Sequence, residues 1–123
     1  MRSKEAASLR LLRTGEVVAD RVRVPRTFIG RGIGLLGRAG LEPGEGMWIK
    51  PCNGIHMWFM RFTLDAVFLD RRLRVVRVVP ELRPWRMVPL VLRAQSVVEL
   101  PAGTSARLGL VEGDELERVR TGG

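Results

Sequence analysis

Short runs of alternating apolar and polar residues occur along this chain and predict β-strands. The first two runs, Ser8–Arg13 and Glu16–Val24, flank the turn dipeptide Thr14-Gly15 and predict an opening hairpin. Pro25 ends the second run, because proline cannot donate to a sheet hydrogen bond. Further strands are predicted over residues 47–50, 56–61, 66–69, 73–79, 96–100 and 115–119.

Helical patterns are fewer and shorter than the strand patterns. Thr27–Arg38 is predicted either as a short helix capped by Thr27 or as an irregular segment, since each of its glycines costs a helix about 1 kcal/mol relative to Ala. Three prolines between Pro80 and Pro89 predict a surface loop, with a little helix near Leu90–Arg93. Ala102–Leu108 predicts one or two helical turns that end at Gly109.

Together these elements predict an α+β fold rich in β-structure. We expect one compact domain over residues 8–119, with a mainly antiparallel rolled sheet or small barrel of about seven strands plus two short helices. A chain of 123 residues with 46% hydrophobic composition can bury one sizeable core but is too short for two ordinary domains. Residues 1–7 and 120–123 are expected to be loose termini.

The cysteine count and the N-terminal sequence indicate the compartment. A single cysteine cannot form an internal disulfide, so the fold does not require an oxidising environment. The N-terminus lacks the continuous apolar region of a secretion signal, and no apolar run is long enough to span a membrane. We therefore expect a cytoplasmic protein.

The formal net charge of +8 comes almost entirely from arginine, with 19 Arg and 2 Lys. The segment Arg71–Arg93 holds seven arginines against one acid, Glu81, with Trp85 between them. This pattern is most typical of a solvated basic surface, and an arginine-favouring genome would produce it too. Weak nucleic-acid binding through this segment is an alternative, since arginine grips phosphate with two hydrogen bonds.

Candidate chemistry is concentrated in Pro51–Asp70, which holds the only cysteine, the only histidine and one of the three tryptophans. A Cys52-Asn53-Gly54 turn leads into an aromatic strand. On that strand His56 shares a face with Trp58 and Met60, while Met57 points the other way. Rare reactive groups beside large apolar side chains predict a pocket.

Two chemical interpretations of Cys52 and His56 stand beside a structural one. A thiolate paired with an imidazole would suit nucleophilic catalysis, and the two residues with Met57 and Met60 would suit copper(I). Because the chain has one Cys and one His, a closed zinc site made from these residue types alone is excluded. The structural interpretation is a half-buried thiol and a histidine at a pocket rim, and we expect no metal and no cofactor.

Other polar residues and motifs have mainly structural explanations. Asp65 and Asp70 point to opposite faces of an extended strand, so they are not a paired general acid and base. Asp70 is expected to hydrogen-bond its own turn, and Asp65 to need a partner as an ion pair or cap. Glu99 is a charged group near a strand end that can face a pocket. Gly32–Gly37 spells G-x-G-x-x-G, but Pro43 and two further glycines follow too soon for a dinucleotide site.

Several motifs in order resemble one known family. They are PCNGIHMWFMRFTLDAVFLD, Gly34-Leu35-Leu36-Gly37-Arg38 before it, Pro84-Trp85-Arg86 after it, and the closing Glu99-Leu-Pro-Ala-Gly and Gly113-Asp114. With these, the chain resembles the domain of unknown function number 192 family over Ser8–Val119. The resemblance implies a single β-rich domain, widespread in bacteria and archaea, with no established activity, so no catalytic residue carries over. Many members have Gly at the position of Leu73, which predicts a different turn there.

The favoured function is a non-catalytic binding or accessory domain for a small anionic or amphipathic ligand or a peptide. Its predicted pocket is lined by Cys52, His56, Trp58, Met60 and Arg61, with Arg38 or Asp65 at the edge. A small enzyme using Cys52 with His56 is the first alternative, and nucleic-acid attachment through Arg71–Arg93 is the second.

Overall fold

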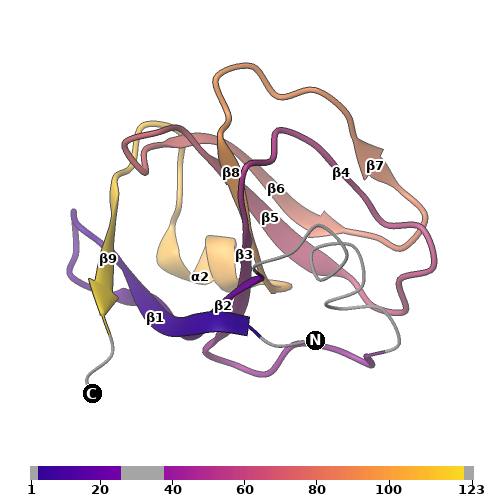
Figure 1. Ribbon diagram of the computed structural model, residues 1–123, viewed down its shortest axis with the longest axis horizontal. Helices are drawn as coiled ribbons and strands as arrows, with labels where there is room; N and C mark the ends of the chain where they lie inside the picture. The colour runs from indigo at the N-terminus through magenta and orange to yellow at the C-terminus, as the bar shows by residue number, and fades with distance from the viewer. Residues whose placement is uncertain (1–2, 26–37, 121–123) are drawn as a thin grey trace.

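The computed structural model describes residues 3–25 and 38–120, and it is built around one curled sheet (Figure 1). Seven strands form this sheet in the order β6-β5-β8-β3-β2-β1-β9, and β4 and β7 form a separate two-stranded ribbon. The predicted segment Thr27–Arg38 and the motif Gly32–Gly37 lie outside the described residues, apart from Arg38. The elements are β1 (Ser3–Leu11), β2 (Val17–Pro25), β3 (Glu45–Ile49), β4 (Ile55–His56), β5 (Leu64–Leu69), β6 (Val75–Leu82), β7 (Met87–Val88), β8 (Ser96–Pro101), α2 (Thr104–Leu108) and β9 (Leu116–Arg120).

The sheet is mainly antiparallel and rolls toward closure. Only β2 and β3 pair in parallel among the described strands. The two edges of the sheet approach each other where Arg74 and Glu115 form an isolated antiparallel bridge. Beside that bridge the Val75 N–H donates to the Asp114 carbonyl at 2.7 Å, and the Leu116 N–H donates to the Leu73 carbonyl at 2.9 Å. The predicted rolled, β-rich sheet is therefore confirmed.

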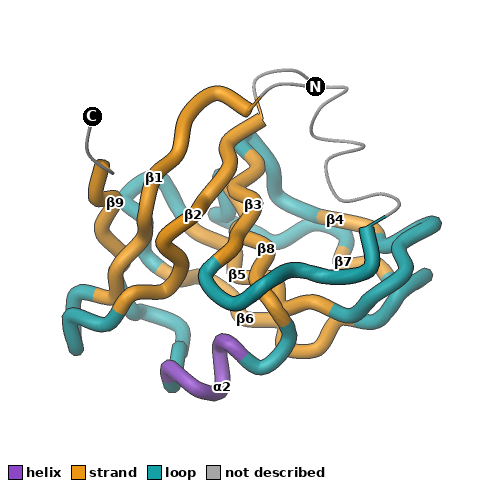
Figure 2. The backbone as a smooth tube through the Cα atoms, turned by 90° about the horizontal axis from the view of Figure 1, so that it is seen from below, coloured by secondary structure: helices purple, strands orange, loops and turns teal. Residues whose placement is uncertain are grey.

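Alternating residues of the central strands pack into two different apolar clusters. In β8, Val98 and Leu100 belong to a cluster that includes Leu108 of α2, whereas Val97 belongs to a second cluster. The second cluster includes Met57 and Val88, which come from the β4–β7 ribbon and its turn. Because both faces of β5 and β8 are covered, every residue of β5 is buried. Figure 2 shows α2 and the β4–β7 ribbon at different sides of the sheet.

Strand β6 continues past the point at which the sequence predicted its end. Pro80 was expected to stop the strand, but β6 runs to Leu82. The expectation was wrong because β6 is an edge strand of the sheet, where the missing proline N–H costs no ladder hydrogen bond. Glu81 follows with φ 52 and donates its N–H to Asp65 Oδ1 at 2.9 Å.

Two further local predictions were wrong, and one turn differs from expectation. Of the predicted strand 56–61, only His56 lies in a strand, at the end of β4, because Phe59 adopts φ 66 and reverses the chain. Leu90–Arg93 is a turn instead of a helix, with Arg93 at φ 70. Leu73 adopts a positive φ of 62, the conformation that glycine favours, although the lack of glycine predicted a different turn there. Within the described residues, no helix has the length and apolar character needed to cross a bilayer.

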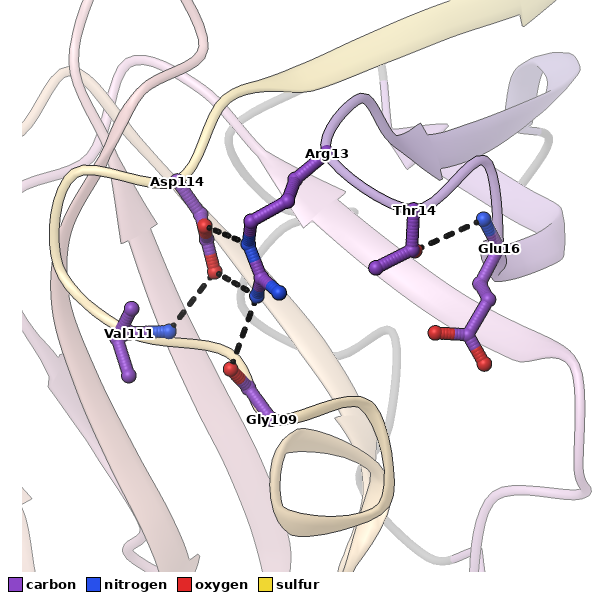
Figure 3. A network of polar contacts seen from close by, with 6 residues as sticks. All are labelled: Arg13, Thr14, Glu16, Gly109, Val111 and Asp114. Carbon is purple, nitrogen blue, oxygen red and sulfur yellow. Dashed lines mark hydrogen bonds and ion pairs between the residues drawn. The ribbon is translucent and has the colours of Figure 1, made fainter.

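An ion pair ties the N-terminal hairpin to the C-terminal segment (Figure 3). Arg13 Nε lies 2.9 Å from Asp114 Oδ1, and its Nη2 lies 3.0 Å from Oδ2. The same guanidinium donates to the Gly109 carbonyl at 3.2 Å, and the Val111 N–H donates to Asp114 Oδ2 at 3.0 Å. The hydrogen bond from Arg13 is the main reason why the pKa of Asp114 is lowered. This network joins the β1–β2 turn to the loop between α2 and β9.

Candidate functional site

The two strands of the β4–β7 ribbon alternate between a buried face and an exposed face. His56 lies directly opposite Met87, and Ile55 lies opposite Val88. Met57 and Val88 are 1% and 4% exposed and pack into the second apolar cluster. His56 and Met87 on the strands are exposed, and so are Trp58 and Trp85 in the adjoining turns. His56 and Trp58 share a face that excludes Met57, as predicted, but Met60, which was predicted on the same face, packs against the cluster of Met57 instead.

The exposed side chains form a continuous row of aromatic rings. His56 stacks on Trp58 with ring centroids 5.5 Å apart and an interplanar angle of 22°. Trp58 meets Trp85 at 6.1 Å, and Trp85 meets Phe59 at 4.9 Å. We call this set the aromatic face; its members are His56, Trp58, Phe59, Trp85 and Met87.

Two tight turns hold the aromatic face in position. Phe59 and Trp85 both have positive φ, at 66° and 68°, a conformation that is uncommon for large residues and that turns each side chain outward. The Trp85 N–H donates to the Met57 carbonyl at 2.8 Å, and the Met57 N–H donates to the Arg86 carbonyl at 2.7 Å. Because the turns are bonded to each other, the rings are positioned before any ligand arrives.

The two segments that carry the aromatic face also contain exposed arginines. Residues 55–63 and 83–93 contain four arginines and no acid, and all four are exposed. Among the described residues, no ion pair engages Arg61, Arg83 or Arg86. An exposed aromatic row beside unpaired guanidinium groups suits a partner that is both apolar and negatively charged.

Cys52 lies in the turn that precedes β4 and is half-buried. Its Sγ donates to the Gly54 carbonyl at 3.0 Å. The turn is packed closely, because a Cβ on Gly54 would collide with the carbonyl oxygens of Pro89 and Val88. Cys52 also lines an open cavity of about 210 Å³ with Pro51, Asn53, Ala94 and Gln95.

Cys52 and His56 have different hydrogen-bond partners and do not line the same cavity. His56 Nδ1 accepts from the Trp58 N–H at 3.4 Å, and His56 does not line the cavity beside Cys52. No hydrogen bond joins these two side chains, both of which are described. In the described part of the chain, no group of three or more His, Cys, Asp or Glu side chains has the arrangement to hold a metal ion.

The remaining predicted site residues have partners of their own. Arg38 Nη2 donates to Glu45 Oε1 at 2.8 Å, and Arg23 adds a second ion pair to Glu45 at 3.8 Å. Burial pushes the pKa of Glu45 upward, but bonds from the Glu42 N–H and Arg38 leave it below its ordinary value. Met60 is half-buried against the second apolar cluster. Arg61 is exposed.

Asp65 is fully buried and accepts hydrogen bonds from three residues in two segments, the end of β6 and the start of α2. Its Oδ2 accepts from the Ser105 N–H at 2.8 Å and the Ser105 hydroxyl at 2.7 Å, at the start of α2. Its Oδ1 accepts from the N–H groups of Glu81 and Gly103. The expected need for a cap partner is confirmed for Asp65, and Asp70 bonds its own turn through Arg72 and Arg74 as predicted.

Glu99 is the most unusual ionisable group in the described structure. It lies on β8 between Met47 of β3 and Ala66 of β5, and its residue exposure is 7%. Burial raises its pKa to about 7. Among residues 3–25 and 38–120 no hydrogen bond or ion pair engages its carboxyl group.

The comparisons with known proteins agree with the motifs. The model of DUF192, described as "Uncharacterized ACR", matches residues 10–118. The chain belongs to the DUF192 family. It is 34% identical over 105 residues to a UPF0127 protein of Pyrococcus abyssi, covering 80% of this chain and 86% of that one. A UPF0127 protein of Pyrococcus horikoshii is 32% identical over 102 residues, covering 78% and 85%.

A solved structure gives the same fold for this DUF192 chain. A protein of unknown function from Novosphingobium aromaticivorans superposes with a TM-score of 0.77 at 25% identity, covering 91% of this chain and 83% of that one. Neither the family nor these relatives carry an assigned activity, so function has to be argued from the chain's own surface.

Sequence reasoning missed three members of the aromatic face: Phe59, Trp85 and Met87. The ribbon strands are two residues long, and their pairing joins segments separated by β5 and β6. A usable signal was present in the repeated spacing, because His56-x-Trp58 and Trp85-x-Met87 each place two large side chains on one face.

Proposed function

We propose that this DUF192 protein is a non-catalytic binding or accessory domain that uses its aromatic face to hold a small anionic or amphipathic ligand or a peptide segment. The observation that carries the proposal is the two-faced ribbon, in which Met57 and Val88 anchor the core while His56, Trp58 and Trp85 are held outward. Soluble proteins rarely expose contiguous apolar patches without a binding role.

The charge of the surrounding surface supports an anionic ligand. Arg61 was predicted as a site residue, and Arg83 and Arg86 flank the turn that carries Trp85. These exposed guanidinium groups have no ion-pair partner in the described structure, so an incoming anion displaces no internal salt bridge.

Cys52 is assigned to the edge of the site. It precedes the ribbon in a turn closed by its bond to Gly54 and opens to the neighbouring cavity. The enzyme alternative has less support, since a cysteine nucleophile needs a base within hydrogen-bond reach and no hydrogen bond joins the described Cys52 and His56 side chains. Arg38 and Asp65 are engaged with Glu45 and Ser105, which supports a structural role for both.

Anilinonaphthalene sulfonate, an anionic aromatic molecule, is the probe that tests this proposal. Wild-type protein should enhance its fluorescence in a saturable titration, and Trp85→Ser should weaken binding about tenfold, the cost of losing a large apolar contact. Val111→Ser is the matched control, because Val111 is 57% exposed but lies outside the ribbon. Equal weakening by both variants, or no saturable binding by the wild type, would overturn the proposal.

A further inference from the structure

The aromatic face combines features that a general ligand site does not require. Phe59 is 71% exposed and Trp85 is 56% exposed, so each presents most of a large apolar side chain to water. Both occur at positive φ in turns that are bonded through Met57, so the side chains project from a fixed support. The segment after β7 adds Leu90 and Leu92, which are 63% and 73% exposed.

Arginines flank these apolar tips. Arg83 and Arg86 enclose the turn of Trp85, and Arg61 follows the turn of Phe59 by two residues. An apolar projection flanked by cations matches the boundary of an anionic bilayer, where phosphate groups lie above hydrocarbon. Trp is the side chain that favours this boundary, since its ring is apolar and its N–H is polar.

We propose that the aromatic face docks onto the surface of an anionic phospholipid bilayer, with Phe59, Trp85 and Met87 entering the headgroup region. This inference rests on the proposed function and names its partner. Arg61, Arg83 and Arg86 contact the lipid phosphates. Only side chains at the end of the β4–β7 ribbon contact the membrane, and the rest of the protein stays outside it.

Two other partners fit the same surface less well. Single-stranded nucleic acid would use the rings for base stacking, but His56 and Trp58 already stack on each other, and exposed Met87, Leu90 and Leu92 cannot stack on bases. A second copy of the chain would bring two sets of unpaired arginines together, which like-charge repulsion opposes.

Vesicle binding tests the inference directly. The protein should sediment with vesicles made of equal parts phosphatidylcholine and phosphatidylglycerol, and much less with vesicles of phosphatidylcholine alone. Phe59→Ser should weaken binding to the anionic vesicles about tenfold. Arg83→Gln should weaken it about fivefold, since one basic residue near an anionic surface contributes about that factor. Val111→Ser and Arg72→Gln are exposed controls outside the ribbon, and both should bind like the wild type.

A second readout uses the wild-type protein alone. Lipids brominated on their acyl chains should quench the emission of Trp58 and Trp85, whereas Trp48 is 2% exposed in the core and should stay unquenched. Equal loss of vesicle binding in the Val111→Ser control would show that lipid meets another surface, and this would overturn the inference.

The failure of this inference is distinguishable from failure of the proposed function. No vesicle binding by a protein that still binds anilinonaphthalene sulfonate through Trp85 would overturn the lipid partner and leave the binding face. Binding of a thymidine oligonucleotide without vesicle binding, or a dimer abolished by Phe59→Ser without vesicle binding, would also overturn it and identify the other partner.

Discussion

The indole rings of Trp58 and Trp85 lie with their centroids 6.1 Å apart at an interplanar angle of 33°. Trp58 lies in the turn that follows β4 and Trp85 in the turn that precedes β7, and the opposite face of this β4–β7 ribbon is part of the core. The β4–β7 ribbon and its turns therefore have one face packed on the core and one exposed face. Shortening a side chain on the core face should destabilise the fold more than shortening one on the exposed face.

Met57→Ala should destabilise the protein by about 3 kcal/mol, because it removes a side chain that is 1% exposed and leaves a cavity. Trp85→Ala should cost less than about 1.5 kcal/mol, since its ring contacts are on the surface. Urea unfolding of the two variants measures the contrast. Equal destabilisation would show that the aromatic face is part of the core.

Asp65→Asn should destabilise the fold by about 3 kcal/mol, because each carboxylate oxygen accepts two hydrogen bonds and the amide NH₂ can accept none. Asp70→Asn is the control, since only its Oδ1 accepts bonds and a turn amide can replace it. Urea midpoints compare the two variants. A loss of less than about 1 kcal/mol for Asp65→Asn would contradict the assigned role.

Glu99 gives a pH dependence that a variant can remove. Its folded pKa of about 7 lies above the ordinary glutamate value of 4.5, so the native state holds the proton more tightly than the unfolded chain. The free energy of unfolding should therefore fall by about 1.4 kcal/mol per pH unit from this group as the pH rises from about 4.5 to 7, and level off above that. Glu99→Gln should lack this decline. If the free energy of unfolding changes with pH in the same way for the wild type and the variant, Glu99 is not the source of the decline.

The Arg13–Asp114 pair has the opposite sign. The pKa of Asp114 is lowered in the folded state, so the pair stabilises the protein above the unfolded pKa and loses that effect as the pH falls through the folded pKa. Asp114→Asn should lower the urea midpoint at neutral pH and have little effect in strong acid. An equal effect at both pH values would mean that packing, not charge, explains the change.

The sequence was sufficient for those parts of the fold that depend on local pattern. Alternation in Ser8–Arg13 and Ser96–Leu100 predicted strands that the structure contains, and Gly109 ends α2 with φ 65 as a C-cap should. Asp70 was correctly assigned to its turn. These features depend on neighbouring residues only.

Features that depend on distant pairing could not be predicted in the same way. Pro80 is tolerated because β6 happens to be an edge strand, and the conformation at Phe59 depends on bonds from Met57 to Trp85 and Arg86. For the site, the shared face of His56 and Trp58 followed from spacing, but their contact with Trp85 required the β4–β7 pairing. The proposed participation of Cys52 remains a prediction.

The indole N–H signals of the three tryptophans provide the most direct test of the binding face. In nuclear magnetic resonance spectra recorded during titration with anilinonaphthalene sulfonate, the signals of Trp58 and Trp85 should shift together in a saturable way, while that of buried Trp48 should stay in place. Unchanged Trp58 and Trp85 signals at a probe concentration that saturates fluorescence would contradict the account, because the ligand would then occupy a different surface.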